Sequence, residues 1–129
     1  MGVEDLVVLR LKMFKFEISA EDTDIIAFLI QKALNSINNI TNQNYTEDTF
    51  PISLKEIWID KAVGEYLKLK NTLGELPENF ETLAVSQIKE GDTTVSFSET
   101  STDKKIDSLI NMLLFSRDFE LLKYRRLVW

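Results

Sequence analysis

The sequence of 129 residues contains no cysteine and no histidine. Without them the chain cannot form disulfides, thiolate zinc sites, iron–sulfur clusters or a serine–histidine–aspartate triad. It also has no glycine-rich phosphate-binding loop and no catalytic-serine motif. We therefore expect no cofactor and no enzymatic activity. A carboxylate-based enzyme stays open as an alternative, because the chain carries 21 acidic residues.

Long apolar runs and basic residues are also scarce. No apolar run approaches the roughly 20 residues of a membrane-spanning helix, and the acidic start at Glu4 and Asp5 does not match a signal peptide. Lys and Arg number 15 against 21 Asp and Glu, which gives a net charge of -6. Tight binding to phosphates requires a basic surface. We expect a cytoplasmic protein that binds neither membranes nor DNA tightly.

The length predicts a single domain, and only 4 Gly and 2 Pro interrupt it. Apolar residues recur at helical spacing. They predict a mainly α-helical small bundle with two long helices and two to three short ones. The long helices are expected at 21–41 and 54–73, and the short ones at 3–14, 77–85 and 103–116. The stripe of the first short helix is Leu6, Leu9 and Met13, and that of the second long helix is Leu54, Ile57, Trp58, Ala62, Val63, Tyr66 and Leu67.

Capping residues mark the ends of the two long helices. Ser19 and Asp22 form an N-cap pair before the first. Ser53 and Glu56 have the spacing of a capping box before the second, and Gly74 is expected to end it.

Two other features have both a structural and a functional interpretation. The acidic run at 21–24 lacks the glycine and trailing glutamate of a calcium loop. We favour negative charge at a helix N-terminus over a metal site. Gly64 falls inside the second long helix, where we favour close contact with another helix over a functional hinge.

After residue 91 the spacing of apolar residues changes from the helical period to the two-residue alternation of a β-strand. Thr93, Val95 and Phe97 alternate with polar residues, and Gly91-Asp92 permits a tight turn. We expect a short strand or hairpin arm near 88–97 that reaches a neighbouring subunit or a channel. The residues assigned to this arm are Glu90, Gly91, Asp92, Thr93, Thr94, Val95 and Phe97.

The last residues are both basic and aromatic. Such residue types are enriched at interface hot spots, but a last helix or strand that covers the core is an equally good interpretation. We expect a helical domain at 1–116 and a C-terminal docking segment at 117–129. The residues assigned to docking on a subunit or another protein are Tyr124, Arg125, Arg126, Leu127, Val128 and Trp129.

The order of these elements resembles the head–tail connector family of tailed bacteriophages, also called head-completion or adaptor proteins. The resemblance covers residues 3–98. It lies in a short helix with Asp5-Leu6, the acidic cap at 21–24, two long amphipathic helices and Gly-Asp-x-x-Val-Ser-Phe at 91–97. It includes no catalytic signature.

The resemblance implies a structural virion protein. Copies would form a ring, often a dodecamer, beneath the portal protein, extend the DNA conduit and offer a platform to a tail-completion or tail-terminator protein. The ring would assemble in the host cytoplasm and lie in the virion neck. An acidic wall would let DNA pass without tight binding. The alternative is an acidic helical interaction module that is not part of a virion, for instance a monomeric or dimeric regulator that binds a host protein.

Overall fold

The computed structural model describes residues 2–77 and 102–125. These residues form a helical bundle and contain no β-strand, so the mainly α-helical prediction is confirmed. The predicted arm near 88–97 lies outside the described residues, as does the short helix expected at 77–85 apart from its first position. The elements in chain order are α1 (Val3–Met13), α2 (Ala20–Thr41), the 3-10 turn η1 (Ile52–Leu54), α3 (Lys55–Leu73), α5 (Thr102–Phe115), α6 (Asp118–Leu121) and the 3-10 turn η2 (Leu122–Tyr124).

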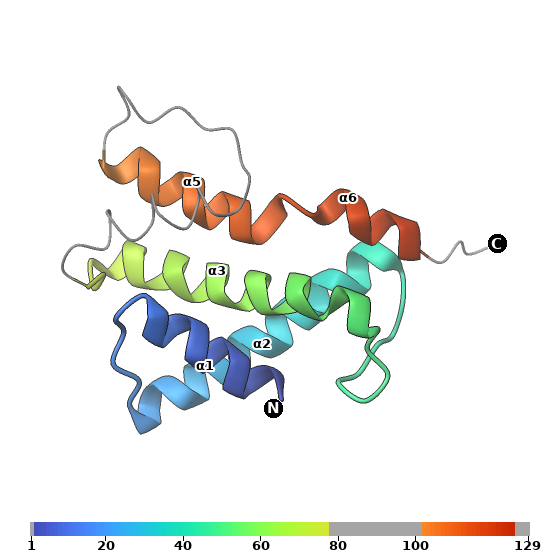
Figure 1. Cartoon of the computed structure of the whole chain (residues 1–129), viewed down its shortest axis with the longest axis horizontal. Helices are drawn as coiled ribbons and strands as arrows, with labels where there is room; N and C mark the ends of the chain where they lie inside the picture. Colours follow the sequence, from blue (N-terminus) through green and yellow to red (C-terminus); the bar gives the residue numbers. More distant parts are fainter. Residues whose placement is uncertain (1, 78–101, 126–129) are drawn as a thin grey trace.

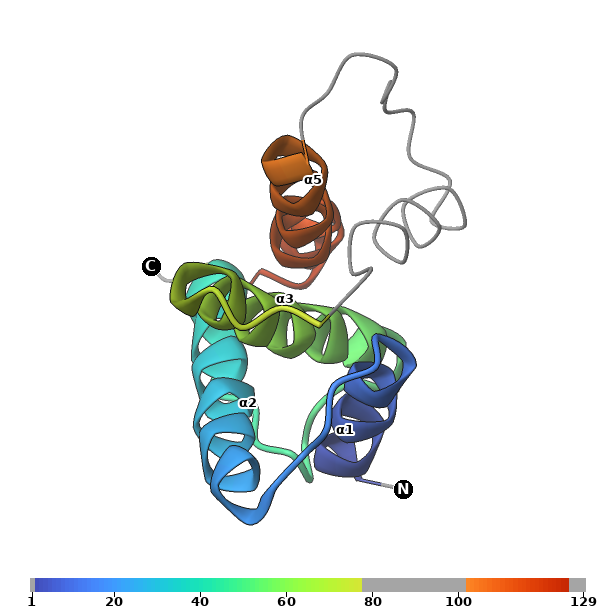
Figure 2. The ribbon, with the colours of Figure 1, turned by 90° about the vertical axis from the view of Figure 1, so that its left-hand side faces the viewer.

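Helix α3 is the centre of the bundle. It packs against α5 on one side and against α2 and α1 on the other (Figure 1). Viewed near its axis, α2 and α1 lie on opposite sides below α3, and α5 lies above it (Figure 2). Residues on almost every side of α3 are consequently buried, including the whole predicted stripe. The buried set of α3 is Ile57, Trp58, Ile59, Lys61, Ala62, Val63, Gly64, Tyr66 and Leu67.

Local capping fixes both ends of α2, and the predicted N-cap pair is confirmed. The Ser19 hydroxyl accepts a hydrogen bond from the Asp22 backbone N–H at 3.2 Å. The Asp22 carboxylate in turn accepts from the Ser19 backbone N–H at 3.0 Å. At the other end Asn42 adopts a left-handed conformation with φ 54°. This conformation is less costly for asparagine than for most residues, so the helix stops there.

The predicted capping box at the start of α3 is wrong. Ser53 lies within η1, and Leu54 precedes α3 without a side-chain cap. The Leu54 N–H instead donates to the Pro51 carbonyl at 3.0 Å, so a backbone bond closes this turn. The Ser53 hydroxyl is therefore free to bond the Tyr124 hydroxyl, 2.8 Å away. The predicted end of α3 is confirmed, because Gly74 caps it with φ 71°.

Helix α1 is confirmed, but only Leu6 of the stripe that predicted it packs against the core. Leu9 and Met13 are exposed, whereas the buried residues of the helix are Val3, Val7 and Leu11. Both sets have helical spacing, so periodicity alone could not decide which face packs against α3 and α2. The consequence is an apolar outer face on α1.

Gly64 allows α5 to approach α3 closely. A Cβ atom at this position would lie 3.0 Å from the Leu114 side chain and 3.1 Å from the Leu113 Cβ. That spacing is tighter than ordinary van der Waals contact. The predicted close contact between helices is therefore confirmed.

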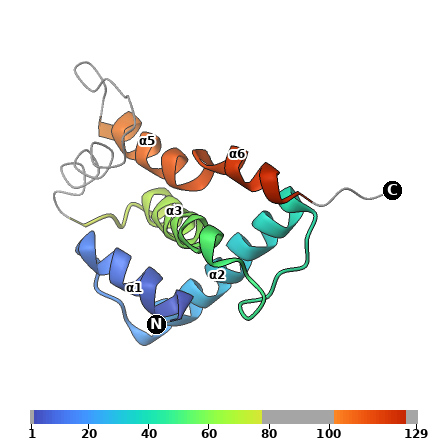
Figure 3. The same ribbon diagram turned by 45° about the vertical axis from the view of Figure 1, so that its right-hand side comes forward.

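The last described residues pack onto the bundle. Helix α6 continues the direction of α5 and reaches the C-terminal end of α2 (Figure 3). Leu121 is completely buried. The Gln43 side chain donates a hydrogen bond to the Tyr124 carbonyl at 3.1 Å. Residues 118–124, within the expected docking segment at 117–129, thus cover the core.

Candidate functional site

In the ranges 2–77 and 102–125, no three acidic side chains are placed to hold a metal ion. Every buried side-chain nitrogen or oxygen there has a hydrogen-bond partner. Among the helices of the same ranges, none combines the length and apolar character that crossing a bilayer requires. The features that stand out are a polar cluster and three apolar surfaces.

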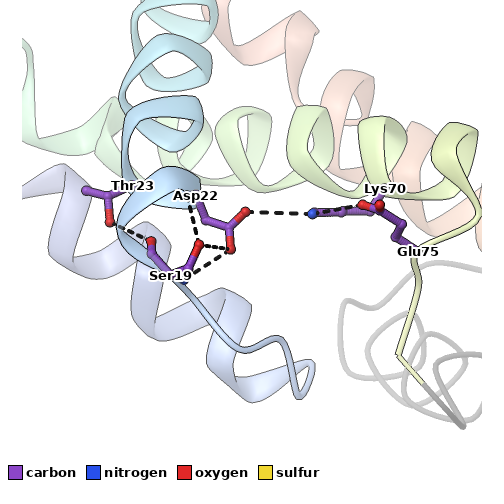
Figure 4. Close-up of polar contacts among 5 residues, drawn as sticks. All are labelled: Ser19, Asp22, Thr23, Lys70 and Glu75. Atoms are coloured by element: carbon purple, nitrogen blue, oxygen red, sulfur yellow. Dashed lines mark hydrogen bonds and ion pairs between the residues drawn. The ribbon is translucent and has the colours of Figure 1, made fainter.

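The polar cluster joins the start of α2 to the end of α3, and we call it the clasp (Figure 4). It consists of Ser19, Asp22, Lys70 and Glu75. The Lys70 ammonium lies 3.7 Å from the Asp22 carboxylate and 3.1 Å from the Glu75 carboxylate. It also lies 5.5 Å from the centre of the Tyr66 ring. The clasp therefore holds the chain just beyond α3 against the N-terminus of α2.

The pKa values in the clasp follow from these contacts. The Ser19 backbone N–H lowers the pKa of Asp22, and Lys70 lowers it further against the opposing effect of burial. Burial lowers the pKa of Lys70, but its partners Glu75, Tyr66 and Asp22 outweigh that effect and the pKa is raised. Burial raises the pKa of Tyr66. The charged forms of Asp22 and Lys70 are thus the stable ones, which fits a structural role better than proton transfer.

We expect the Asp22→Ala variant to lose about 1 kcal/mol of unfolding free energy, because it removes the capping carboxylate. Since the folded-state pKa of Asp22 is lowered below 3.8, this stabilisation is present above pH 3.8 and disappears as the pH falls through the lowered value. Urea unfolding of both proteins between pH 7 and pH 2 would measure the difference. Asp24→Ala is the matched control, since this exposed acid makes no ion pair within the described part of the chain. A difference that persists unchanged at pH 2 would contradict this account.

The first apolar surface is a groove between α1 and the start of α3, which we call the α1–α3 groove. Its volume is about 570 Å³. Ile52 stands at its edge with 89% of its surface exposed, and Leu9 is also exposed. Arg10 and Asp60 form an ion pair of 2.6 Å in its wall. The complete lining is Leu6, Leu9, Arg10, Ile52, Lys55, Glu56, Ile59 and Asp60.

The second apolar surface lies on α2 where it meets the C-terminal half of α3, and we call it the Phe28 ridge. Phe28 is 69% exposed, and Ile25 lies one turn before it on the same face. A shallow depression of about 350 Å³ accompanies them. The lining residues are Ile25, Phe28, Leu29, Lys32, Glu65, Lys68, Leu69 and Thr72.

The third apolar surface follows the junction of α5 and α6. Phe115, Phe119 and Leu122 are all exposed there. Single exposed apolar residues are ordinary on a soluble protein, but groups of them rimmed by polar side chains mark sites of protein association. The part of the chain that the structure describes presents three such groups.

The residues predicted from the sequence to mediate docking are only partly described. Tyr124 is half-buried and bonded to Ser53, while Arg125 is exposed. Arg126, Leu127, Val128 and Trp129 lie outside the described residues, as do all the arm residues from Glu90 to Phe97. Sequence reasoning missed Phe28 and Ile52. Phe28 is a large apolar residue that lies outside the buried stripe of α2. An apolar residue at such a position was the signal in the sequence that could have indicated an exposed apolar surface.

Comparisons with protein-family models, curated proteins and solved structures returned no match. The functional interpretation therefore rests on the residues themselves.

Proposed function

We propose that this protein is a structural subunit of a head–tail connector ring in a tailed bacteriophage or prophage. The observation that supports this most is the position of the α1–α3 groove and the Phe28 ridge. The α3 residues that line the two surfaces point about 160° apart around the helix axis at 100° per residue. Two distinct association surfaces on nearly opposite faces suit head-to-tail contacts between copies.

Head-to-tail contacts generate a closed ring when the rotations between successive copies add up to a full turn, and an open filament otherwise. A two-fold dimer would instead use one self-complementary surface. The acidic composition also suits this proposal, because a ring multiplies the net charge of -6 by its copy number. Such a wall repels DNA and lets it slide. The ring would bind the portal protein on one side and a tail-completion or tail-terminator protein on the other.

The direct test of self-association is analytical ultracentrifugation over a wide concentration range, with and without the portal protein from the same genome. A connector subunit would sediment as a large, discrete oligomer in at least one of the two conditions. A monomer or simple dimer that does not bind the portal protein would instead support the alternative function, an acidic interaction module outside the virion.

Removing residues 126–129 should leave the melting temperature within about 2 °C of the parent and abolish binding to the portal protein. The reason is that Leu121 and Tyr124 already close the bundle. Thermal unfolding monitored by circular dichroism and portal binding by co-sedimentation would measure the two effects. Truncation after residue 116 is the contrasting variant, since loss of buried Leu121 should destabilise the fold. If the short deletion also unfolds the protein, these residues cover the core instead.

A further inference from the structure

The Phe28 ridge carries an exposed aromatic side chain, and the α1–α3 groove offers a hollow lined by exposed apolar residues. Phe28 is 69% exposed with Ile25 beside it, and both residues line the depression of about 350 Å³ on α2. The groove is concave, and its volume of about 570 Å³ is large enough to admit several side-chain groups. Its exposed apolar residues, Leu9 and Ile52, would lose contact with water if the ridge entered it.

The α2 end of the ridge is complementary in charge to the groove, whereas Lys68 on the α3 side of the ridge carries a positive charge that pairs with no described residue. Glu21 and Asp24 are exposed on α2 just before Ile25 and Phe28. Within residues 2–77 and 102–125, neither carboxylate has an ion-pair partner. Lys55, in the groove, likewise forms no ion pair with any described residue. The other charged groups of the groove are already engaged, because Arg10 pairs with Asp60 and Glu56 lies 3.7 Å from Arg117.

We propose that the Phe28 ridge of one copy inserts into the α1–α3 groove of the next copy, with Asp24 placed against Lys55. This inference rests on the proposed function, because it names the contact by which ring subunits join. The ridge and the groove lie on nearly opposite faces of α3. Each copy therefore accepts the ridge of one neighbour in its groove and inserts its own ridge into the groove of another. The contact therefore propagates from copy to copy and cannot be satisfied within a two-fold pair.

The absence of native cysteine allows a direct cross-linking test. One protein carries Ile25→Cys, which leaves Phe28 in place, and a second carries Ile52→Cys. We expect a short bismaleimide to join the two efficiently when they are mixed, and a protein with both changes to give a ladder of oligomers. The control replaces Ile25→Cys with Ser36→Cys. Ser36 is exposed on the same helix but lies about 16 Å further along its axis than position 25, so it should cross-link poorly.

Charge reversal tests the polar part of the contact. Asp24→Lys and Lys55→Glu should each weaken self-association about 10-fold, measured by sedimentation. The double variant should recover most of the loss, because it recreates an opposite-charge pair with the signs exchanged. Phe28→Asp should weaken association at least 30-fold with little change in the thermal transition, because Phe28 is largely exposed in the single chain.

The outcomes separate this inference from the proposed function. Cross-links specific to positions 25 and 52, together with charge rescue, support the inference. Oligomers that form normally without these cross-links, or without rescue, overturn the inference and leave the connector proposal standing. A chain that stays monomeric at all concentrations and with the portal protein present overturns both.

Discussion

Replacing Asp118 with alanine should lower the free energy of unfolding by about 3 kcal/mol, because it leaves a buried ammonium group without its carboxylate. Lys61 lies inside α3 with only 4% of its surface exposed. Its Nζ donates to the Asp118 carboxylate at 2.6 Å and to the Leu114 carbonyl, and it lies 5.7 Å from the centre of the Phe115 ring. One lysine thus ties the end of α5 to the start of α6.

The Lys61→Met variant should cost less, about 1 kcal/mol, because it removes the buried charge together with its need for a partner. Asp118 is 34% exposed and can then be solvated by water. The double variant, Lys61→Met with Asp118→Ala, should have a free energy of unfolding close to that of Lys61→Met alone. Urea denaturation of the three variants would measure these differences. If Asp118→Ala is no more destabilising than Lys61→Met, Lys61 has access to water or another partner and this explanation is wrong.

The Gly64→Leu variant should also lose about 3 kcal/mol of unfolding free energy, because the leucine side chain would enter the space occupied by Leu113 and Leu114. The α3 and α5 helices would have to separate to accept it. Ala27→Leu is the matched control. It also enlarges a small helical residue, but Ala27 is exposed on α2, so we expect a change below about 0.5 kcal/mol.

Denaturation curves for both variants would compare the effects. A Gly64→Leu protein as stable as the control would show that α5 is not held at a fixed distance from α3. Gly64 and Lys61 lie three residues apart on the side of α3 that faces α5. Together they position α5, α6 and the third apolar surface at Phe115, Phe119 and Leu122. Changes at either position should consequently disturb any partner that uses this surface.

The parts of the fold that depend on local chemistry could be predicted from the sequence. Ser19 and Asp22 are three residues apart, and their mutual bonds require nothing outside that turn. Gly74 ends α3 because the left-handed conformation costs glycine little. The stripe of α3 was predicted correctly because this helix is buried on almost every side, so any apolar stripe on it faces another helix.

The errors and omissions depend on contacts between distant residues. Ser53 has the spacing of a capping residue, but its hydroxyl bonds Tyr124, 71 positions along the chain. Leu9 and Met13 have the same spacing as the buried residues of α1, and only packing shows that they face outward. Lys61 gives no sign in the sequence that it is buried, because its partner lies beyond α5. The α1–α3 groove and the Phe28 ridge follow from helix packing, which periodicity does not specify.

Electron microscopy of the purified protein, alone and mixed with its portal protein, tests the proposed connector function most directly. The account predicts closed rings of uniform copy number around a central channel, stacked axially on the portal ring when the two are mixed. Particles no larger than a dimer in both samples would contradict it.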